Sequence, residues 1–274
     1  MNGTIANGLL GHTPAPATVP EDPNYKTTYL ITGASRGIGK ALVASYLLRP
    51  NTTVIACVRN PTTQSAPLLS LPKSPTSTLI TVQLDCESPT DSTTAATTLR
   101  SSHNLTHIDV VIANAAIAAN FGPASTMPLE HLERHMMVNM YSVLLLFQAM
   151  KEFLQAARKG SAKFVFVGAP ISTITGMEEY KRSPLFAYGV SKLAANYLVR
   201  KVHFENAWLV AFVVDPGHVQ TDMGDVGARL MGRKEAPTTI QESVDGICAR
   251  IDEATKEESS GHFLLHTDGS KLPW

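Results

Sequence analysis

The chain has 274 residues, of which 44% are hydrophobic and 17% are charged, so it is long enough to bury a substantial core and too apolar to be disordered. Its 23 basic and 23 acidic residues balance, which argues against a nucleic-acid-binding protein, because such proteins present a basic face. The most apolar stretch, residues 136–147, is interrupted by polar side chains, and we therefore predict no membrane span.

The first 25 residues are rich in Pro, Gly, Ala, Thr and Asn, and no Lys or Arg precedes Lys26. A secretory signal begins with a basic segment and a mitochondrial presequence carries arginines, so neither is predicted. We interpret residues 1–25 as a flexible leader and residues 26–274 as a single domain. Three widely spaced cysteines, Cys57, Cys86 and Cys248, argue against a disulfide framework and fit a reducing compartment, which places the protein in the cytoplasm.

From residue 28 onward, short β-branched runs alternate with helical patterns. The predicted strands cover residues 28–32, 53–58, 79–84, 110–113, 163–167, 208–214 and 262–265. The predicted helices cover residues 38–48, 91–100, 129–157, 184–204 and 239–254. The strands are continuous apolar runs, which is typical of strands covered on both faces. The pattern predicts an α/β fold: a Rossmann-type, doubly wound parallel sheet of about seven strands with helices on both faces.

Two segments are predicted to be long loops. Residues 60–78 contain four prolines and many Ser and Thr, and residues 217–237 contain four glycines. Loops of this length in a compact domain are either variable insertions or lids. We interpret the first segment as an insertion and the second as a lid.

The first predicted strand runs into a glycine-rich turn and then into a helix, in the order Gly33-Ala34-Ser35-Arg36-Gly37-Ile38-Gly39. Glycines at these places permit a tight turn, close approach of a pyrophosphate to the backbone, and close packing of helix on strand. Free amides at the helix start favour a phosphate group. A glycine cluster alone is a weak signal, but the strand, turn and helix around it predict a dinucleotide site.

The end of the second predicted strand indicates which dinucleotide binds. An NAD site places an acidic residue there to bind the ribose 2′-hydroxyl, whereas this strand ends Cys57-Val58-Arg59-Asn60. Arg59 and Arg36 are suited to a 2′-phosphate, although both are equally compatible with ordinary solvated arginines. We therefore predict NADP(H) as the cofactor.

A tyrosine and a lysine, Tyr188 and Lys192, are four residues apart in a predicted helix that begins with Ser183 as N-cap and Pro184 as its first residue. At this spacing both side chains project from one face. An ammonium beside a phenol lowers the phenol pKa, and such a tyrosine protonates a carbonyl oxygen while hydride reaches the carbon. The spacing alone is common, so its meaning depends on the residues that accompany it.

Together these residues resemble the short-chain dehydrogenase/reductase family over residues 28–267. The resemblance implies that Asp85 contacts the adenine and that Ala113-Asn114-Ala115-Ala116 corresponds to the family's Asn-Asn-Ala-Gly motif, with Asn114 retained. It implies a catalytic group of Asn139, Tyr188 and Lys192, with Lys192 also holding the nicotinamide ribose. The residues implied at the nicotinamide end are Pro216, Gly217, Val219 and Thr221.

One position departs from the family pattern. The family has a serine just past the fifth strand that binds the substrate carbonyl, and here the ungapped position holds Ala169. We predict that Ser172, or alternatively Thr173, replaces the missing hydroxyl. A fully engaged oxyanion donor is worth about 3–4 kcal/mol in the transition state.

Within this family the chain looks most like fungal ketoreductases of aflatoxin-type polyketide pathways, on the segments 121–132, 168–175, 215–223 and 267–274. That resemblance implies reduction of the side-chain ketone of an anthraquinone, norsolorinic acid, to averantin. A set of apolar side chains is expected at the mouth of the site: Phe121, Met127, Met177, Tyr180, Phe186 and Met223. The alternatives are a carbonyl reductase with another substrate and a non-catalytic NADP-binding protein, the latter favoured only by Ala169.

Other patterns carry less weight. His131 and His135 have metal-ligand spacing on a helix, but no third ligand and no His-Glu-x-x-His motif accompany them, so no metal is predicted. His218 is expected in the lid, exposed to water. The predicted helix 129–157 is apolar on more than one face near residues 144–147, which favours a homo-oligomer, a dimer or a tetramer.

Overall fold

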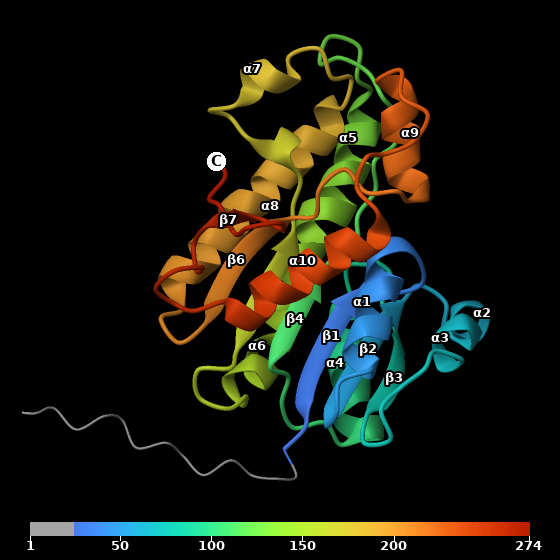
Figure 1. The fold of residues 1–274 in the computed structure, drawn as a ribbon, viewed down its shortest axis with the longest axis vertical. Coiled ribbons are helices and arrows are strands. Elements are labelled where there is room, and N and C mark those ends of the chain that lie inside the picture. The colour runs from blue at the N-terminus through green and yellow to red at the C-terminus, as the bar shows by residue number, and fades with distance from the viewer. Residues whose placement is uncertain (1–24) are drawn as a thin grey trace, which may run out of the picture.

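The computed structural model describes residues 25–274 (Figure 1). The predicted leader therefore lies outside the described residues except for Tyr25. The Tyr25 hydroxyl donates to the Asp109 carboxylate at 2.5 Å. Seven parallel strands form one sheet in the order β3-β2-β1-β4-β5-β6-β7. The strands are β1 (Thr27–Thr32), β2 (Thr52–Val58), β3 (Thr78–Gln83), β4 (Val110–Ala113), β5 (Lys163–Val167), β6 (Val210–Asp215) and β7 (Phe263–Leu265). The predicted doubly wound fold is confirmed.

Helices cover both faces of the sheet, and each face has its own apolar core (Figure 1). On one face pack α1 (Gly37–Leu47) and α10 (Ile240–Glu253), and on the other α4 (Asp91–His103), α6 (Ser142–Gln155) and α8 (Phe186–Glu205). Alternate strand residues supply the two cores: Leu30 faces the second group of helices, whereas Tyr29 and Ile31 face the first. Two-sided burial explains why the strands are apolar throughout.

The helix predicted over residues 129–157 is present but is not a uniform α-helix. It consists of α5 (Leu129–Met136), a π-helical turn at Met137–Tyr141 and α6. A π turn inside a helix is often found at a functional site, and this one contains Asn139. The predicted start of α8 is wrong: the helix begins at Phe186, and Ser183 and Pro184 precede it. The Pro184 carbonyl instead accepts from the Gly122 amide at 2.7 Å.

Both predicted long loops contain helices. The segment 60–78 holds α2 (Pro61–Gln64) and α3 (Ala66–Leu69), and Leu68 of α3 is buried in the core beside α1. The segment 217–237 holds α9 (Asp222–Leu230), capped by the Thr221 side chain, which accepts from the Gly224 amide. The buried Leu68 and the N-cap Thr221 are weak signals among many Pro, Gly and Ser residues. Helices this short also show too little hydrophobic periodicity to be predicted.

A short 3₁₀ turn at Pro170–Ser172 and the small helix α7 (Met177–Tyr180) follow β5. Helices α7 and α9 both lie beyond the carboxyl ends of the strands (Figure 1). No helix within residues 25–274 is long and apolar enough to cross a bilayer.

Candidate active site

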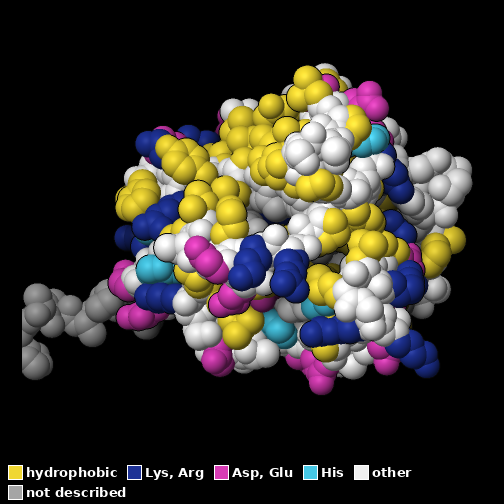
Figure 2. All heavy atoms as spheres, turned by 90° about the horizontal axis from the view of Figure 1, so that it is seen from above, with side chains coloured by type: hydrophobic (Ala, Val, Ile, Leu, Met, Phe, Trp, Pro, Cys, Tyr) yellow, Lys and Arg dark blue, Asp and Glu magenta, His cyan; other side chains and the backbone are white. Residues whose placement is uncertain are grey.

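A cavity of about 810 Å³ opens at the carboxyl ends of the strands. This is where open α/β sheets bind ligands, at the point where the strand order reverses between β1 and β4. Seen from above in Figure 2, this face of the molecule is hollowed near its middle, and hydrophobic side chains gather around the hollow. The cavity is lined by the glycine turn, the ends of β2 to β5, the first turns of α8, and residues 216–225 after β6.

The glycine turn between β1 and α1 has the geometry of a phosphate cradle. Gly33 and Gly37 have positive φ angles of 65° and 55°. A Cβ atom on Gly33 would lie 2.9 Å from the Ala115 Cα, and one on Gly37 would lie 3.3 Å from the Thr221 Cγ2. A Cβ on Gly39 would collide with the main-chain oxygen of Gly33. Each glycine is thus required by its surroundings, and the residues fit a dinucleotide whose pyrophosphate approaches the backbone.

Asn114 holds the glycine turn from the neighbouring strand β4. Its side-chain amide donates to the Thr32 carbonyl at 2.9 Å, and its backbone amide donates to the Thr32 hydroxyl at 3.0 Å. The Ala115 amide donates to the same hydroxyl. Asn114 therefore supports the cradle, and it also lines the cavity, where the sequence predicted it.

The ends of β2 and β3 form the far end of the cavity. Arg59 and Asp85 line it together with two cysteines, Cys57 and Cys86. Both thiols are buried, and burial raises the pKa of Cys86 to about 11 and that of Cys57 still further, so both are protonated at neutral pH. No carboxylate stands at the end of β2, and Arg59 is exposed there.

Arg36 of the glycine turn forms an ion pair with Asp222 at the start of α9, at 2.7 Å. The two side chains are 69% and 80% exposed, so water screens the pair and its contribution to stability is small. Ser35, Arg36 and Ile38 all line the cavity. The pair links the glycine turn to the start of α9.

Tyr188 and Lys192 lie on the first turns of α8 and both line the cavity. The Lys192 ammonium is buried, donates to the Val167 carbonyl at the end of β5 (2.8 Å), and lies 5.7 Å from the centre of the Tyr188 ring. Burial lowers the pKa of Lys192 to about 7. Burial, and then the nearby Asp215 carboxylate, raise the pKa of Tyr188 well above its usual value.

The predicted lowering of the Tyr188 pKa is therefore wrong for the protein without a bound cofactor. Desolvation outweighs any effect of the lysine charge, because both side chains lie in a poorly solvated region and a phenolate is costly there. Tyr188 keeps its proton at neutral pH. A protonated phenol is the form that donates to a carbonyl oxygen.

Asn139 lies in the π-helical turn and is fully buried. Its side chain pairs with both main-chain groups of Ile117, accepting from the amide and donating to the carbonyl at 2.9 Å each. It also donates to Ser191, whose hydroxyl donates to the Tyr188 carbonyl. Asn139 thus joins the chain after β4 to α8 beside the tyrosine, although its side chain is not part of the cavity wall.

The hydroxyls predicted to replace the family's serine do not reach the cavity. Ala169 lines it, but Ser172 and Thr173 are buried behind it. The Ser172 hydroxyl donates to the Ala169 carbonyl at 2.6 Å and accepts from Asn196 at 2.7 Å. The Thr173 hydroxyl donates to the Trp274 main-chain oxygen and accepts from the Gly176 amide. The 3₁₀ turn at Pro170–Ser172 directs both hydroxyls away from the cavity. Comparing the sequence with the family pattern residue by residue does not reveal this turn.

The segment after β6 borders the nicotinamide end predicted from the sequence. Pro216, Gly217, Val219 and Thr221 all line the cavity. His218, expected to be exposed, is instead half-buried, and its Nε2 lies 2.7 Å from the Gly224 carbonyl. His218 therefore ties the segment to the first turn of α9.

The apolar mouth is only partly as predicted. Phe121, Tyr180 and Met223 line the cavity, and Ile171, Leu185 and Met231 add apolar surface that the sequence did not indicate. The other three predicted residues are not part of the wall: Met127, Met177 and Phe186. The mouth remains suited to a flat, apolar ligand.

The last residue, Trp274, fastens the segment between the 3₁₀ turn and α7. Its main-chain oxygen accepts from the amides of Ile174 (3.1 Å) and Thr175 (3.2 Å). The hydroxyls of Thr173 (3.2 Å) and Thr175 (2.6 Å) donate to the same oxygen. This convergence of donors was not foreseen, because nothing in a sequence pairs positions 99 to 101 residues apart.

His135 is a structural residue. Its ring is fully buried, with Nε2 accepting from the Ala119 amide (3.2 Å) and Nδ1 2.7 Å from the His131 carbonyl. Both ring nitrogens are thus occupied by the backbone. Within residues 25–274 no group of three or more His, Cys, Asp or Glu has a geometry that would hold a metal ion.

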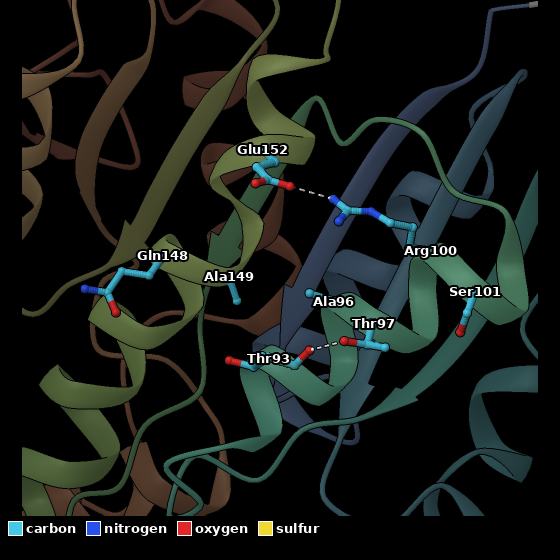
Figure 3. A pocket seen from close by; sticks show the side chains of 8 residues that line it. All are labelled: Thr93, Ala96, Thr97, Arg100, Ser101, Gln148, Ala149 and Glu152. Carbon is cyan, nitrogen blue, oxygen red and sulfur yellow. Dashed lines mark hydrogen bonds and ion pairs between the residues drawn. The ribbon is translucent and has the colours of Figure 1, made fainter.

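A smaller hollow of about 360 Å³ lies between α4 and α6 (Figure 3). An ion pair between Arg100 and Glu152, at 3.0 Å, crosses it, and Thr97 donates to the Thr93 carbonyl. Its remaining lining residues are small or uncharged: Ala96, Ser101, Gln148 and Ala149. It offers no acid–base pair comparable to Tyr188 and Lys192.

The chain matches the family model described as short chain dehydrogenase over residues 27–228. It is 68% identical to the norsolorinic acid ketoreductase of Dothistroma septosporum, over 93% of this chain and 95% of that protein. It is 60% identical to the norsolorinic acid ketoreductase of Aspergillus parasiticus, over the full length of both. Among solved structures, NADPH-bound carbonyl reductase from chicken fatty liver is 26% identical with a TM-score of 0.79, covering 91% of this chain and 95% of that one. The chain therefore belongs to the short-chain dehydrogenase/reductase family of oxidoreductases.

Proposed function

We propose that this protein is an NADPH-dependent ketoreductase that reduces the side-chain ketone of an aromatic polyketide, with norsolorinic acid as substrate and averantin as product. The observation that carries the proposal is a single cavity in which Tyr188 and Lys192 share a wall with the glycine cradle. Relatives 60–68% identical to this chain bear the name norsolorinic acid ketoreductase. The apolar mouth, with Phe121 and Met223, supports a flat aromatic substrate.

The residues present suit a nicotinamide dinucleotide. Gly33, Gly37 and Gly39 would admit the pyrophosphate, and Asp85 would contact the adenine at the far end. For the choice of NADP(H) over NAD(H), the support is the arginine at the end of β2. Arg59 stands where an NAD site places a carboxylate, and Arg36 lines the same cavity.

The chemistry is a two-electron reduction of a carbonyl group. When bound, the reduced nicotinamide supplies a hydride to the carbonyl carbon. Tyr188 donates its phenolic proton to the carbonyl oxygen, so the ketone becomes a secondary alcohol. The Lys192 ammonium, anchored on the Val167 carbonyl, lies beside the ring and stabilises the phenolate that remains until solvent returns the proton.

The test is NADPH oxidation, followed by absorbance, with norsolorinic acid and a panel of smaller aryl ketones and isatin. We expect turnover of norsolorinic acid and a product heavier by two hydrogen atoms with the chromatographic retention of averantin. Turnover of isatin without turnover of norsolorinic acid would show a carbonyl reductase of other specificity. No turnover of any carbonyl, with intact NADPH binding, would show a non-catalytic NADP-binding protein.

A further inference from the structure

Helix α8 places three polar side chains on one face at a spacing of four residues: Tyr188, Lys192 and Asn196. The first two line the cavity, and Asn196 lies one turn further along, fully buried. Asn196 has no part in the chemistry proposed above.

The side chains of Lys192 and Asn196 connect α8 by hydrogen bonds to the chain at the end of β5. Lys192 donates to the Val167 carbonyl at 2.8 Å. Asn196 donates to the Ser172 hydroxyl at 2.7 Å, and that hydroxyl donates to the Ala169 carbonyl at 2.6 Å. The residues between these contacts, Gly168 to Ile171, form part of the cavity wall beside Tyr188.

The turn held by Asn196 has little freedom on its other side. A Cβ on Gly168 would lie 2.5 Å from Val213 of β6 and 3.1 Å from Phe263 of β7. The turn is therefore packed against the sheet, and the hydrogen bonds from α8 set its position relative to Tyr188.

Asn196 also has a buried polar atom without a hydrogen-bond partner among the described residues. Its Oδ1 is buried and has no hydrogen-bond partner among residues 25–274. An apolar side chain of the same size would fill the space without leaving a buried acceptor unpaired. Packing alone therefore does not explain an amide here, whereas its hydrogen bond to Ser172 does.

We propose that Asn196 is a positioning residue for carbonyl reduction: through Ser172 it fixes the turn of residues 169–172 against the substrate carbonyl. The proposal rests on the proposed ketoreductase function. With alanine at position 169, residues 168–171 contribute only main chain and apolar side chains to the cavity wall, so the alignment of this part of the wall depends on what holds the turn. Ser172 acts in this chain as a link between α8 and the turn.

The experiment compares Asn196→Leu, Ser172→Ala and the double variant in steady-state reduction, using norsolorinic acid and isatin as separate probes. We expect each single variant to lower kcat by up to about 100-fold, the loss that a misplacement of about 1 Å can cause. KM and the NADPH dissociation constant should change less than about threefold. The double variant should be no slower than the slower single variant, because both changes break one chain of hydrogen bonds.

A matched control is Asn206→Ala, at a buried asparagine beyond the end of the same helix, whose side chain donates to the Val202 carbonyl. It should lower the melting temperature and leave kcat unchanged. A folded Asn196→Leu enzyme with wild-type kcat, or kcat losses that multiply in the double variant, would overturn the proposal. Where Asn196→Leu does not fold, Ser172→Ala alone decides, since it removes one oxygen atom. Turnover of isatin alone by the wild-type enzyme refutes the proposed substrate and leaves the test of Asn196 intact.

Discussion

Tyr188 lies in surroundings that keep its phenol protonated at neutral pH. Burial and the Asp215 carboxylate raise its pKa, and Lys192, four residues along the helix, has its own pKa lowered to about 7 by burial. The sequence spacing predicted the pair but not this balance, because spacing carries no information on solvation. For reduction of a ketone the protonated phenol is the required form.

Replacing Tyr188 by Phe retains the ring and removes the proton. We expect kcat to fall by at least about a hundredfold, since general acid catalysis contributes about 10²–10⁴-fold. NADPH binding, measured by fluorescence titration, should change little. Normal turnover by the Phe variant would show that another group protonates the carbonyl.

The buried Lys192 should make stability depend on pH. In the folded protein without cofactor its pKa is about 7, against 10.5 for the free side chain. Between these values the unfolded chain binds more protons, so the free energy of unfolding rises with pH; below pH 7 both states are protonated and the full cost of burial is present. Lys192→Met should therefore be more stable than wild type at about pH 7, by a margin that shrinks toward about pH 10.

Urea unfolding followed by circular dichroism across this pH range measures that margin. The exposed Lys159 provides the control, because Lys159→Met removes the same charge without burial. It should show no comparable trend. A margin for Lys192→Met that stays constant with pH would mean that the ammonium is better solvated than its surroundings indicate.

Arg59 is the residue on which cofactor choice depends in our interpretation. Arg59→Asp should weaken NADPH binding and strengthen NADH binding, because a carboxylate repels a 2′-phosphate and accepts from a ribose 2′-hydroxyl. The ratio of the two dissociation constants is the measurement. Equal affinities for the two cofactors in the unaltered protein would refute the prediction.

At the scale of elements, the turn between β1 and α1 is tightly constrained by its neighbours. Gly39→Ala would place a methyl group against the Gly33 main-chain oxygen and 2.7 Å from the Asn114 side-chain nitrogen. Strand and helix would have to separate, which moves the helix amides away from the phosphates. We expect NADPH to bind at least about tenfold more weakly, a loss of about 1.4 kcal/mol.

Gly160→Ala is the control for that variant. Gly160 has a φ of 85°, and no atom lies within 4 Å of the place that a methyl group on it would occupy, so its substitution strains the backbone far from the cradle. It should lower the melting temperature without changing NADPH affinity. Unchanged affinity in Gly39→Ala would show that the turn is not the phosphate cradle.

The long elements were predictable from the sequence, and the short ones were not. Strands such as β4 and β5 match their predicted ranges, because burial on both faces demands a continuous apolar run. The helices α2, α3 and α9 were missed, since each depends on one or two tertiary contacts, such as the burial of Leu68. The π turn around Asn139 leaves no periodic signal of its own.

The candidate site shows the same division. The glycine turn and the Tyr188–Lys192 pair could be predicted, because their spacing is local and their chemistry needs those residue types. The direction of the Ser172 hydroxyl could not, because the 3₁₀ turn that sets it depends on contacts with α8. Asn196 and Trp274 were missed for the same reason: their partners are distant in the chain.

At the scale of the whole molecule, the apolar residues 144–147, which favour a homo-oligomer in the sequence, are buried or half-buried. Leu146 and Phe147 of α6 are buried in the protein's own core. Two of the most exposed apolar side chains are on α8, where Tyr197 and Phe204 are 72% and 68% exposed and share one helix face. We retain the prediction of a homo-oligomer and assign its interface to this face of α8.

Light scattering after gel filtration should give a multiple of the 29.5 kDa chain mass. Tyr197→Glu combined with Phe204→Glu should yield the single-chain mass, because burying two carboxylates in an interface is costly. Leu69→Glu changes an equally exposed leucine on α3 and should leave the mass unchanged. A single-chain mass for the unaltered protein would refute the prediction.

The hydrogen bonds that gather on the Trp274 oxygen have a practical consequence for anyone producing the protein. A linker attached covalently at Trp274 would act on the segment that leads to Tyr180 at the mouth of the cavity, because that segment donates to the Trp274 oxygen. Strand β1 begins at the amino ends of the strands, opposite the end where the cavity opens (Figure 1). A surface attachment is therefore best made away from Trp274, which leaves its oxygen in place to hold the mouth of the cavity.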